Sequence, residues 1–168
     1  MNYKNSHRNN EENAFTPMKI LSFTEKESIV NELKDLFGIR EIKGTMIMKG
    51  REKIFLFLGD FKPRELKKLE NNIIIERTGV YFGKIADGGL RLSIEGTNIL
   101  KEQITKNIFT LDSKQAEDWI FGRDLNIETG KKGFLVMQHN EDFLGCGKAS
   151  EKKIGNFIPK ARRLRERG

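Results

Sequence analysis

The sequence has little of what metal centres, disulfide scaffolds and membrane spans are built from. It contains one cysteine, Cys146, and two histidines, His7 and His139, so no internal disulfide can form and no structural zinc site is expected. The longest apolar run, residues 54–58, is far shorter than the roughly 20 residues that cross a bilayer. The N-terminus is polar and rich in asparagine, without the apolar stretch of a secretory signal. We therefore expect a cytoplasmic protein without metal, cofactor or membrane attachment.

Signatures of common catalytic centres are also missing. The glycines of residues 85–92 do not form G-x-G-x-x-G, and no Walker A lysine loop occurs. Cys146 has no neighbouring base in the sequence, so a small buried strand residue is a better interpretation than a nucleophile. Glu117 and Asp118 are adjacent on a predicted helix and point to different faces, which does not indicate an acid–base pair. We therefore expect that the protein is not an enzyme.

Positive charge is present in excess, and most of it is C-terminal. The chain has fifteen Lys and Arg against twelve Asp and Glu in residues 1–80, eight against ten in residues 81–144, and eight against two in residues 145–168. A localised basic cluster favours a polyanion partner, because neutralised phosphates release counterions. A charge run by itself is more often a solvated, disordered tail. Apolar residues alternate with the cations here, so we expect a docked segment anchored by Ile154, Phe157, Ile158 and Leu164.

The first half of the chain is predicted to form a small α/β domain, residues 16–78, after a disordered extension of residues 1–15. A helix over residues 24–38 is expected to begin with a capping box of Thr24 and Glu27 and to end at Gly38. The other expected elements are a strand at 18–23, a hairpin at 45–60, a helix at 63–70 and a strand at 73–77. The run of apolar residues at 54–58 predicts a strand at the centre of the sheet.

The second half, residues 79–168, is predicted to form a β-barrel-like unit. Asp87-Gly88-Gly89 joins two strand-like runs as a hairpin turn, and a brief helix is expected to be capped by Thr97. A longer helix begins at Asp112 or Ser113, ends at Gly122 and turns Trp119 inward. The expected strands that follow or flank it are 107–111, 123–127, 133–139, 143–149 and a run within 154–164. Seven short strands separated by turns fit a barrel better than a layered sheet.

These residues resemble a PUA domain, a small pseudo-barrel found in RNA-modifying enzymes and ribosome-assembly proteins. The shared pattern is a helix that ends in Gly122, a strand with Asp124-Leu125 and a glycine-containing turn, LGCGKA, at residues 144–149. The order from Gly79 to Ser150 is also similar to the Nip-seven family of ribosome-biogenesis factors, with FGK at residues 82–84 and RL at residues 91–92. The resemblance implies an α+β fold, in which a pre-PUA α/β domain precedes a C-terminal PUA-like β-barrel.

The tail resembles a different group. KKIGNFIPKARRLR, residues 152–165, is similar to the end of the PUA-like domain of Nop/Sun-type RNA cytosine methyltransferases, where a basic N-x-x-P-K segment follows an LG-x-GK turn. Gly145 and Gly147 lack side chains, so the backbone there can approach a phosphodiester; a bulge or barrel corner explains them equally well. The cations expected to line an RNA-binding groove are Lys131, Lys132, Lys148, Lys152, Lys153, Lys160, Arg162, Arg163 and Arg165.

The expected function is that of a non-catalytic RNA-binding adaptor in ribosomal RNA processing or ribosome assembly. Its partner would be ribosomal RNA or tRNA, and its N-terminal domain would be available to a protein partner. The leading alternative is an RNA-modifying enzyme, or its RNA-targeting subunit, in rRNA or tRNA methylation. A third possibility is a protein-interaction module with a solubilising tail. Polar groups that converge in a pocket of the N-terminal half would favour an enzyme over an adaptor.

Overall fold

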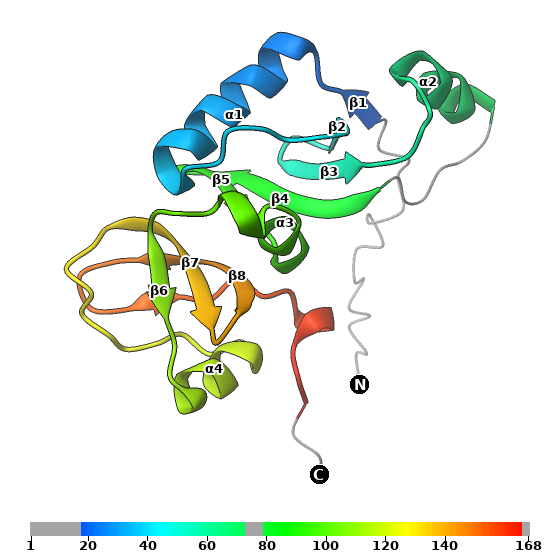
Figure 1. Ribbon diagram of the computed structural model, residues 1–168. Helices are drawn as coiled ribbons and strands as arrows, with labels where there is room; N and C mark the ends of the chain where they lie inside the picture. The colour runs from blue at the N-terminus through cyan, green and yellow to red at the C-terminus, as the bar shows by residue number, and fades with distance from the viewer. Residues whose placement is uncertain (1–17, 73–78, 166–168) are drawn as a thin grey trace, which may run out of the picture.

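The strands of the protein form two sheets, one above the other in Figure 1. The computed structural model describes residues 18–72 and 79–165; the predicted extension at 1–15 and the predicted strand at 73–77 lie outside them. The first sheet is antiparallel, with β1 (Met18–Ile20), β2 (Thr45–Lys49), β3 (Lys53–Phe57), β4 (Val80–Ala86) and β5 (Gly89–Leu92) in that order. The central position predicted for the apolar strand at 54–58 is therefore confirmed.

The second sheet is curled into a half-barrel. Its order is β6 (Ile108–Thr110), β7 (Gly133–His139), β8 (Asp142–Ala149) and β9 (Ile154–Gly155), with β6 parallel to β7 and the other pairs antiparallel. The expected strand at 123–127 is reduced to a single bridge between Leu125 and Ile154. The α+β class and the PUA-like second unit are confirmed.

The predicted boundary at residue 79 does not match the strand pairing. Phe55 of β3 pairs with Tyr81 of β4, and β5 continues the same sheet, so residues 80–92 extend the first sheet instead of opening the barrel. The Gly88-Gly89 turn was correctly predicted, with both glycines at positive φ. A hairpin turn is a local signal, however, and it carries no information about which sheet the hairpin joins.

The helices begin at polar caps, as the sequence patterns require. Helix α1 (Phe23–Phe37) begins at Ser22, whose hydroxyl accepts a hydrogen bond from the N–H of Glu25, while the Glu25 carboxylate accepts one from the N–H of Ser22 at 2.9 Å. The predicted cap at Thr24 is wrong, because Ser22 and Glu25 offer the same three-residue spacing two residues earlier. The predicted stop at Gly38 is confirmed, with φ of 85°.

The other helices are shorter. Helix α2 spans Pro63–Asn72, and α3 spans Ile94–Ile99 with Ser93 as its cap instead of the predicted Thr97, whose side chain is buried. Helix α4 (Ser113–Ile120) is capped by Asp112 in a capping box with Gln115, which confirms one of the two predicted caps. Short 3-10 turns follow at Lys101–Gln103 and Lys160–Arg162.

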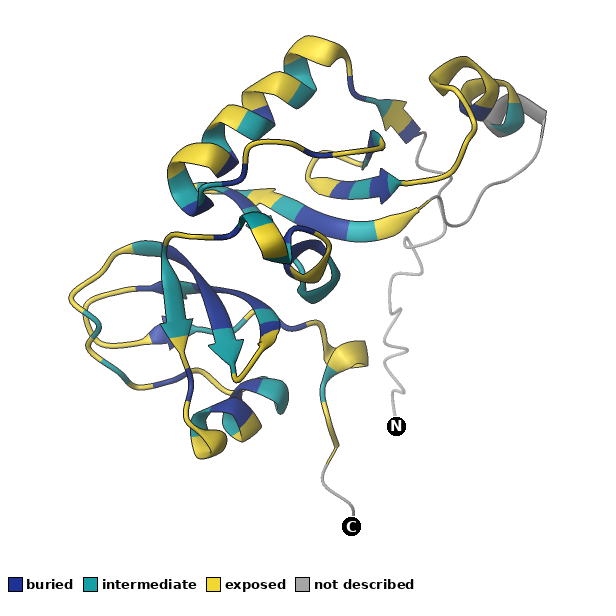
Figure 2. Cartoon of the chain, in the orientation of Figure 1, coloured by how far each residue is buried: buried dark blue, intermediate teal, exposed yellow. Residues whose placement is uncertain are grey.

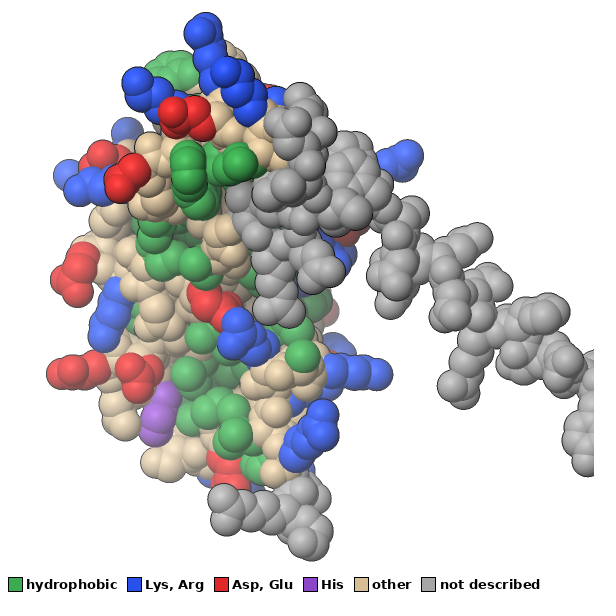
Figure 3. Space-filling model, turned by 90° about the vertical axis from the view of Figure 1, so that its right-hand side faces the viewer, with side chains coloured by type: hydrophobic (Ala, Val, Ile, Leu, Met, Phe, Trp, Pro, Cys, Tyr) green, Lys and Arg blue, Asp and Glu red, His purple; other side chains and the backbone are tan. Residues whose placement is uncertain are grey.

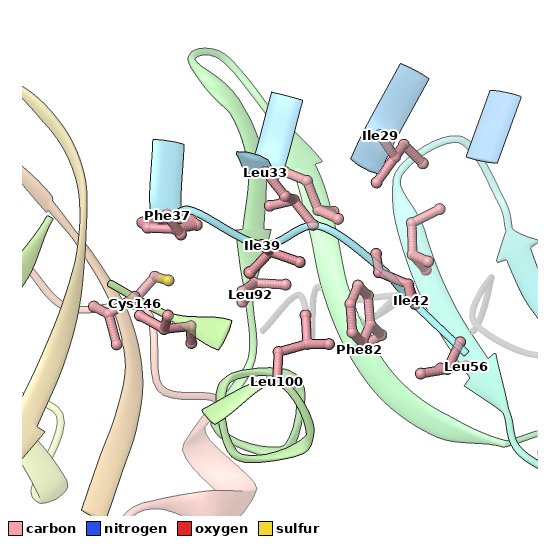
Figure 4. Close-up of a cluster of buried hydrophobic side chains, with 14 of the residues drawn as sticks. Ile29, Leu33, Phe37, Ile39, Ile42, Leu56, Phe82, Leu92, Leu100 and Cys146 are labelled. Carbon is pink, nitrogen blue, oxygen red and sulfur yellow. The ribbon is translucent and has the colours of Figure 1, made fainter. Parts of the chain in front are cut away.

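The largest hydrophobic core belongs to both sheets. Leu33 and Phe37 of α1 and Phe82 of β4 share one buried cluster with Val136 of β7 and Cys146 of β8. Figure 4 shows Cys146 at one end of this cluster, and Figure 2 shows the buried residues of α1 along one side of the helix. Helix α3 contacts both β4 and β8, so it lies between the sheets. The two units are therefore held together by apolar packing.

Two smaller cores complete the packing. Trp119 is fully buried at the centre of the second unit, as predicted. Leu66 of α2 packs with Met18 and Ile47 against the other face of the first sheet, at its β1–β2 end. The remainder of that face, toward β5, is part of the site described next.

Candidate nucleic-acid interface

The C-terminal segment, residues 150–165, is docked onto the second unit. Ile154 and Ile158 are buried, which confirms two of the four predicted anchors. Phe157 and Leu164 are 38% and 56% exposed, so the expectation that they turn inward is wrong. Strand β9 ends at Gly155, so the alternation of a strand does not extend to Phe157 or Leu164.

A side chain that the sequence analysis did not single out fixes this segment. The Asn156 amide donates a hydrogen bond to the carbonyl oxygen of Trp119 at 2.7 Å, and its oxygen accepts one from the N–H of Ile158 at 2.8 Å. The backbone N–H of Asn156 donates to Asp124 Oδ1 at 2.8 Å. One asparagine thus joins the end of α4, the following loop and the C-terminal segment. Its only sequence signal was its place in the N-x-x-P-K pattern.

Asp124 also holds a cation of the segment. Lys153 Nζ lies 2.7 Å from Asp124 Oδ2. This ion pair, and then the Asn156 N–H, keep the pKa of the Asp124 carboxyl below its usual value. The carboxylate is therefore ionised at neutral pH and offers both oxygens to the segment.

Five of the predicted cations are engaged within the protein. Lys132 pairs with Glu151 at 3.1 Å, Lys148 Nζ donates to the carbonyl oxygen of Asp87 at 2.8 Å, Lys153 pairs with Asp124, Arg162 pairs with Glu95, and Arg163 Nε donates to the carbonyl oxygen of Ile158 at 2.8 Å. Lys131, Lys152, Lys160 and Arg165 are exposed. The cluster is therefore a mixture of structural cations and solvated ones.

Figure 3 agrees with this division. The side of the molecule that it shows has Lys and Arg distributed among Asp and Glu, around a central area of hydrophobic side chains. The predicted groove of cations stays a prediction. Charge there is alternating instead of uniformly basic.

Gly145 and Gly147 are both buried, which favours the packing explanation for them. A Cβ atom on Gly147 would lie 2.5 Å from Ile154 Cγ2 and 2.7 Å from the Trp119 ring, so the strand needs glycine to pass the tryptophan. A Cβ on Gly145 would meet the backbone and side chain of Ile94 at 3.3 Å. Their assignment to RNA binding stays a prediction.

A pocket opens where the first sheet, β8 and the C-terminal segment meet. It is a shallow depression with about 310 Å³ of free space when the part open to solvent is included. Three segments line it: Tyr81 and Arg91 to Ile94, then Leu144 to Cys146, then Phe157 to Pro159. The sequence analysis missed this site because the three segments are far apart in the chain.

The polar side chains of the pocket have contacts within the protein. The Arg91 guanidinium lies 4.0 Å from the centroid of the Phe157 ring at the pocket wall. The Ser93 hydroxyl is already used, since it donates to the carbonyl oxygen of Tyr81 at 2.6 Å and accepts from the N–H of Gly96. Burial raises the pKa of the Cys146 thiol to about 12, so the thiol stays protonated at neutral pH. The buried, protonated thiol agrees with the interpretation of Cys146 as a packing residue.

The described residues contain neither a cluster of metal-binding side chains nor a membrane-spanning helix. Within residues 18–72 and 79–165, no group of three His, Cys, Asp or Glu side chains could hold a metal ion. Over the same ranges, no helix has the length and apolarity needed to cross a membrane.

Comparison with known proteins identifies the second unit. A sequence model for the family "Methyltransferase RsmF PUA domain" matches residues 106–164. The second unit is a PUA-like domain. Its match contains the whole of the Trp119, Asp124 and Asn156 network, and it supports RNA binding by this chain.

The relatives extend over more of the chain than this domain. Ribosomal RNA small subunit methyltransferase F of Vibrio cholerae is 22% identical over 145 residues, which are 86% of this chain and 30% of the relative. The Vibrio vulnificus protein of the same name is 24% identical over 144 residues, 86% and 29% of the two chains, and that of Serratia proteamaculans is 27% identical over 124 residues, 73% and 25%. The chain thus spans less than a third of the length of these relatives.

These relatives overturn one expectation. The protein was expected not to be an enzyme, yet each relative is named a methyltransferase, so the chain points to an enzyme family. The expectation was based on missing catalytic motifs, and the matched region is only 25–30% of an enzyme's length. A region of that size can lack catalytic motifs even when it belongs to an enzyme. The predicted likeness to the Nip-seven family stays a prediction.

Proposed function

We propose that this chain recognises small-subunit ribosomal RNA for a methylation reaction, as the RNA-targeting part of an RNA-modifying enzyme. The observation that supports it most strongly is the match of residues 106–164 to the PUA domain of a methyltransferase. The names of the relatives indicate the small ribosomal subunit as the source of the RNA. Among the functions that the sequence allowed, RNA modification is the one that these findings favour.

The geometry suggests how the chain would hold RNA. The exposed cations of the C-terminal segment and of the loop before β7 attract phosphates, which contributes affinity without sequence selectivity. Asp124 and Asn156 fix the backbone of the segment, so its exposed cations are presented from a docked position and less conformational entropy is lost on binding. The core shared by the two sheets keeps the first sheet in a fixed position relative to that RNA.

A binding experiment tests the proposal. Fluorescently labelled transcripts of small-subunit rRNA, large-subunit rRNA fragments of equal length and tRNA would be titrated with the protein at physiological salt. We expect tightest binding to a small-subunit fragment, and crosslinking in the protein's own cells should recover the same region. Equal affinity for all three RNAs would contradict the selectivity, and the absence of binding would contradict the function.

A second measurement addresses the link to methylation. Mass spectrometry of nucleosides from the small-subunit rRNA would be compared between cells with and without the protein. We expect one methylated position to be lost or reduced in cells without it. Unchanged methylation, combined with intact RNA binding, would reject the methylation part of the proposal alone. A cytoplasmic location and a protein partner of the N-terminal unit stay predictions.

A further inference from the structure

The face of the first sheet that points away from α1 carries aromatic and cationic side chains. In the strand register, Phe55 of β3 lies opposite Tyr81 of β4, and Lys84 of β4 lies opposite Arg91 of β5. The core-facing residues of the same strands are Ile54, Leu56, Phe82, Leu90 and Leu92. Since neighbouring strand positions point to opposite faces, Phe55, Tyr81, Lys84 and Arg91 share the outer face. We call these four residues, together with Phe157, the aromatic strip.

A bulge keeps the strip on one face. The register shifts between Ile54 and Phe55: Ile54 lies opposite Gly83 of β4, whereas Phe55 lies opposite Tyr81. The extra residue, Phe82, turns into the core. Without it, strict alternation would send Tyr81 and Lys84, three positions apart, to opposite faces. The irregularity therefore places Tyr81 and Lys84 on the same, outer face.

Each end of the strip has a contact between a ring and a cation. The Phe55 and Tyr81 ring centroids are 5.6 Å apart, and the Lys49 ammonium lies 5.7 Å from the Phe55 centroid. At the other end, the Arg91 guanidinium is stacked on Phe157, which is 38% exposed. Phe55, Tyr81 and Arg91 are half-buried, and Phe55 also packs against the small core beneath α2. The strip continues directly into the pocket, because Tyr81, Arg91 and Phe157 belong to both.

We propose that the aromatic strip binds a short run of unpaired RNA nucleotides, with one base entering the pocket beside Arg91 and Phe157. Unpaired bases stack on aromatic rings and on guanidinium planes, whereas bases inside a duplex offer no free face. The same sheet face carries Lys49, Lys53, Lys84 and Arg91, and Lys84 pairs with Glu52. This charge complements a phosphodiester backbone.

The inference deepens the proposed function and rests on it, because it names the form of RNA that this chain selects. The exposed cations of the C-terminal segment would bind phosphates of paired and unpaired RNA alike. The aromatic strip would then retain only RNA with a loop, bulge or open end within reach of Tyr81. Phe157 belongs to the segment and to the strip, so the two surfaces are adjacent.

Conservative variants test the stacking. Tyr81→Leu and Phe157→Leu keep an apolar side chain but remove the planar ring, and Phe23→Leu is the matched control, since Phe23 is 80% exposed at the start of α1. Fluorescence anisotropy would give the dissociation constants for a short unstructured RNA and for a fully paired RNA of equal charge. We expect the double variant Tyr81→Leu/Phe157→Leu to bind the unstructured RNA about tenfold or more weakly, and the paired RNA with nearly unchanged affinity. Phe23→Leu should change neither.

The outcomes separate this inference from the proposed function. Unchanged binding of the unstructured RNA, or an equal loss for both RNAs, would overturn the aromatic strip while leaving the rRNA proposal intact. A loss of affinity for the unstructured RNA alone would support the aromatic strip, even if the protein bound small-subunit rRNA, large-subunit rRNA and tRNA equally well. If circular dichroism shows that the double variant is unfolded, the unaltered protein is photo-crosslinked to an RNA containing 4-thiouridine instead. Crosslinks must then map to residues 53–57, 80–92 or 154–159, and crosslinks elsewhere would reject the strip.

Discussion

The carboxylate of Asp124 binds the residue that fixes the C-terminal segment: its Oδ1 accepts the backbone N–H of Asn156 at 2.8 Å, while its Oδ2 is 2.7 Å from Lys153 Nζ. The loop after α4 and the basic segment are therefore joined by a charge-assisted hydrogen bond and an ion pair. Both depend on the ionised carboxylate. This single side chain is thus expected to matter for the order of the basic segment.

Replacing Asp124 by asparagine should lower the free energy of unfolding by about 1 kcal/mol, because a charge-assisted hydrogen bond and a partly exposed ion pair are weakened. The folded-state pKa of Asp124 lies below its unfolded value. The stabilisation is therefore complete above the unfolded pKa of about 3.9 and is lost as the pH falls through the lower folded value. Urea unfolding from neutral to acidic pH checks this, and the difference between the two proteins should shrink below about pH 4.

The matched control is Asp35→Asn, at an exposed position of α1. A substitution there should change the stability by less than about 0.5 kcal/mol. A loss of equal size in both variants would show that net charge, and not the contact with Asn156, is responsible.

Gly147→Ala should destabilise the second unit. The new methyl group would lie 2.5 Å from Ile154 Cγ2 and 2.7 Å from the Trp119 ring, and overpacking of this kind costs about 1–3 kcal/mol. Gly155→Ala is the control on the paired strand, where the nearest atoms to a new Cβ are 3.8–4.0 Å away. Thermal unfolding should show a clear decrease in Tm for the first variant only; equal Tm values would contradict the tight passage beside Trp119.

The Cys146 thiol should be unreactive in the folded protein. Its pKa is raised to about 12 by burial, so the reactive thiolate is scarce at neutral or mildly alkaline pH. We expect a thiol reagent to label the native protein only at the rate of its unfolding, and to label it rapidly in guanidinium chloride. Labelling of the native state at the rate of a free cysteine would place Cys146 at the surface.

The contacts within the basic cluster change which variants can isolate RNA binding. Replacing Lys148, Lys153, Lys160 and Arg163 together by alanine would not test RNA binding alone. In the structure, Lys148, Lys153 and Arg163 bind Asp87, Asp124 and the Ile158 carbonyl, so that variant should also lose stability. Its weaker RNA binding would have two causes.

The informative variant replaces the exposed cations Lys131, Lys152, Lys160 and Arg165 by alanine. Its stability should be unchanged, and the slope of log affinity against log salt should fall by about 0.9 for each phosphate that is no longer neutralised. The control, with an equal reduction of charge, replaces Lys34, Lys43, Lys62 and Arg64, which are exposed on the N-terminal unit. An unchanged slope in the first variant, or an equal change in both, would make these C-terminal cations a solubilising surface.

Much of the fold could be predicted from local patterns. The sequence correctly predicted the helix end at Gly38, the turn at Gly88-Gly89 and the central strand at 54–58. A positive φ angle favours glycine, and a fully apolar strand is favoured only where both of its faces are covered. Ser22 and Thr24 both offer a cap at the start of α1, and only packing distinguishes them. The membership of β4 in the first sheet depends on long-range pairing with Phe55, which no local pattern contains.

The site was less predictable than the fold. The basic residues could be found from composition, yet the partners of Lys148 and Arg162 lie in other elements, at Asp87 and Glu95. Arg91 and Phe157 are more than sixty positions apart in the sequence, so their stacking had no sequence signal. Only its place in the N-x-x-P-K pattern distinguishes Asn156 in the sequence, because its partners Trp119 and Asp124 are more than thirty positions away.

The mixed core around Phe37 and Cys146 has a consequence for how the molecule opens. Because β7 and β8 complete the same apolar interior as α1 and the first sheet, neither unit can open without exposing the other to water. Amide hydrogens in β3 and in β8 should therefore exchange with deuterium through one common event, at one free energy. An RNA that binds on either sheet would slow amide exchange in both sheets. RNA bound at the PUA-like domain would therefore also protect the amide hydrogens of the first sheet, which lies outside that domain.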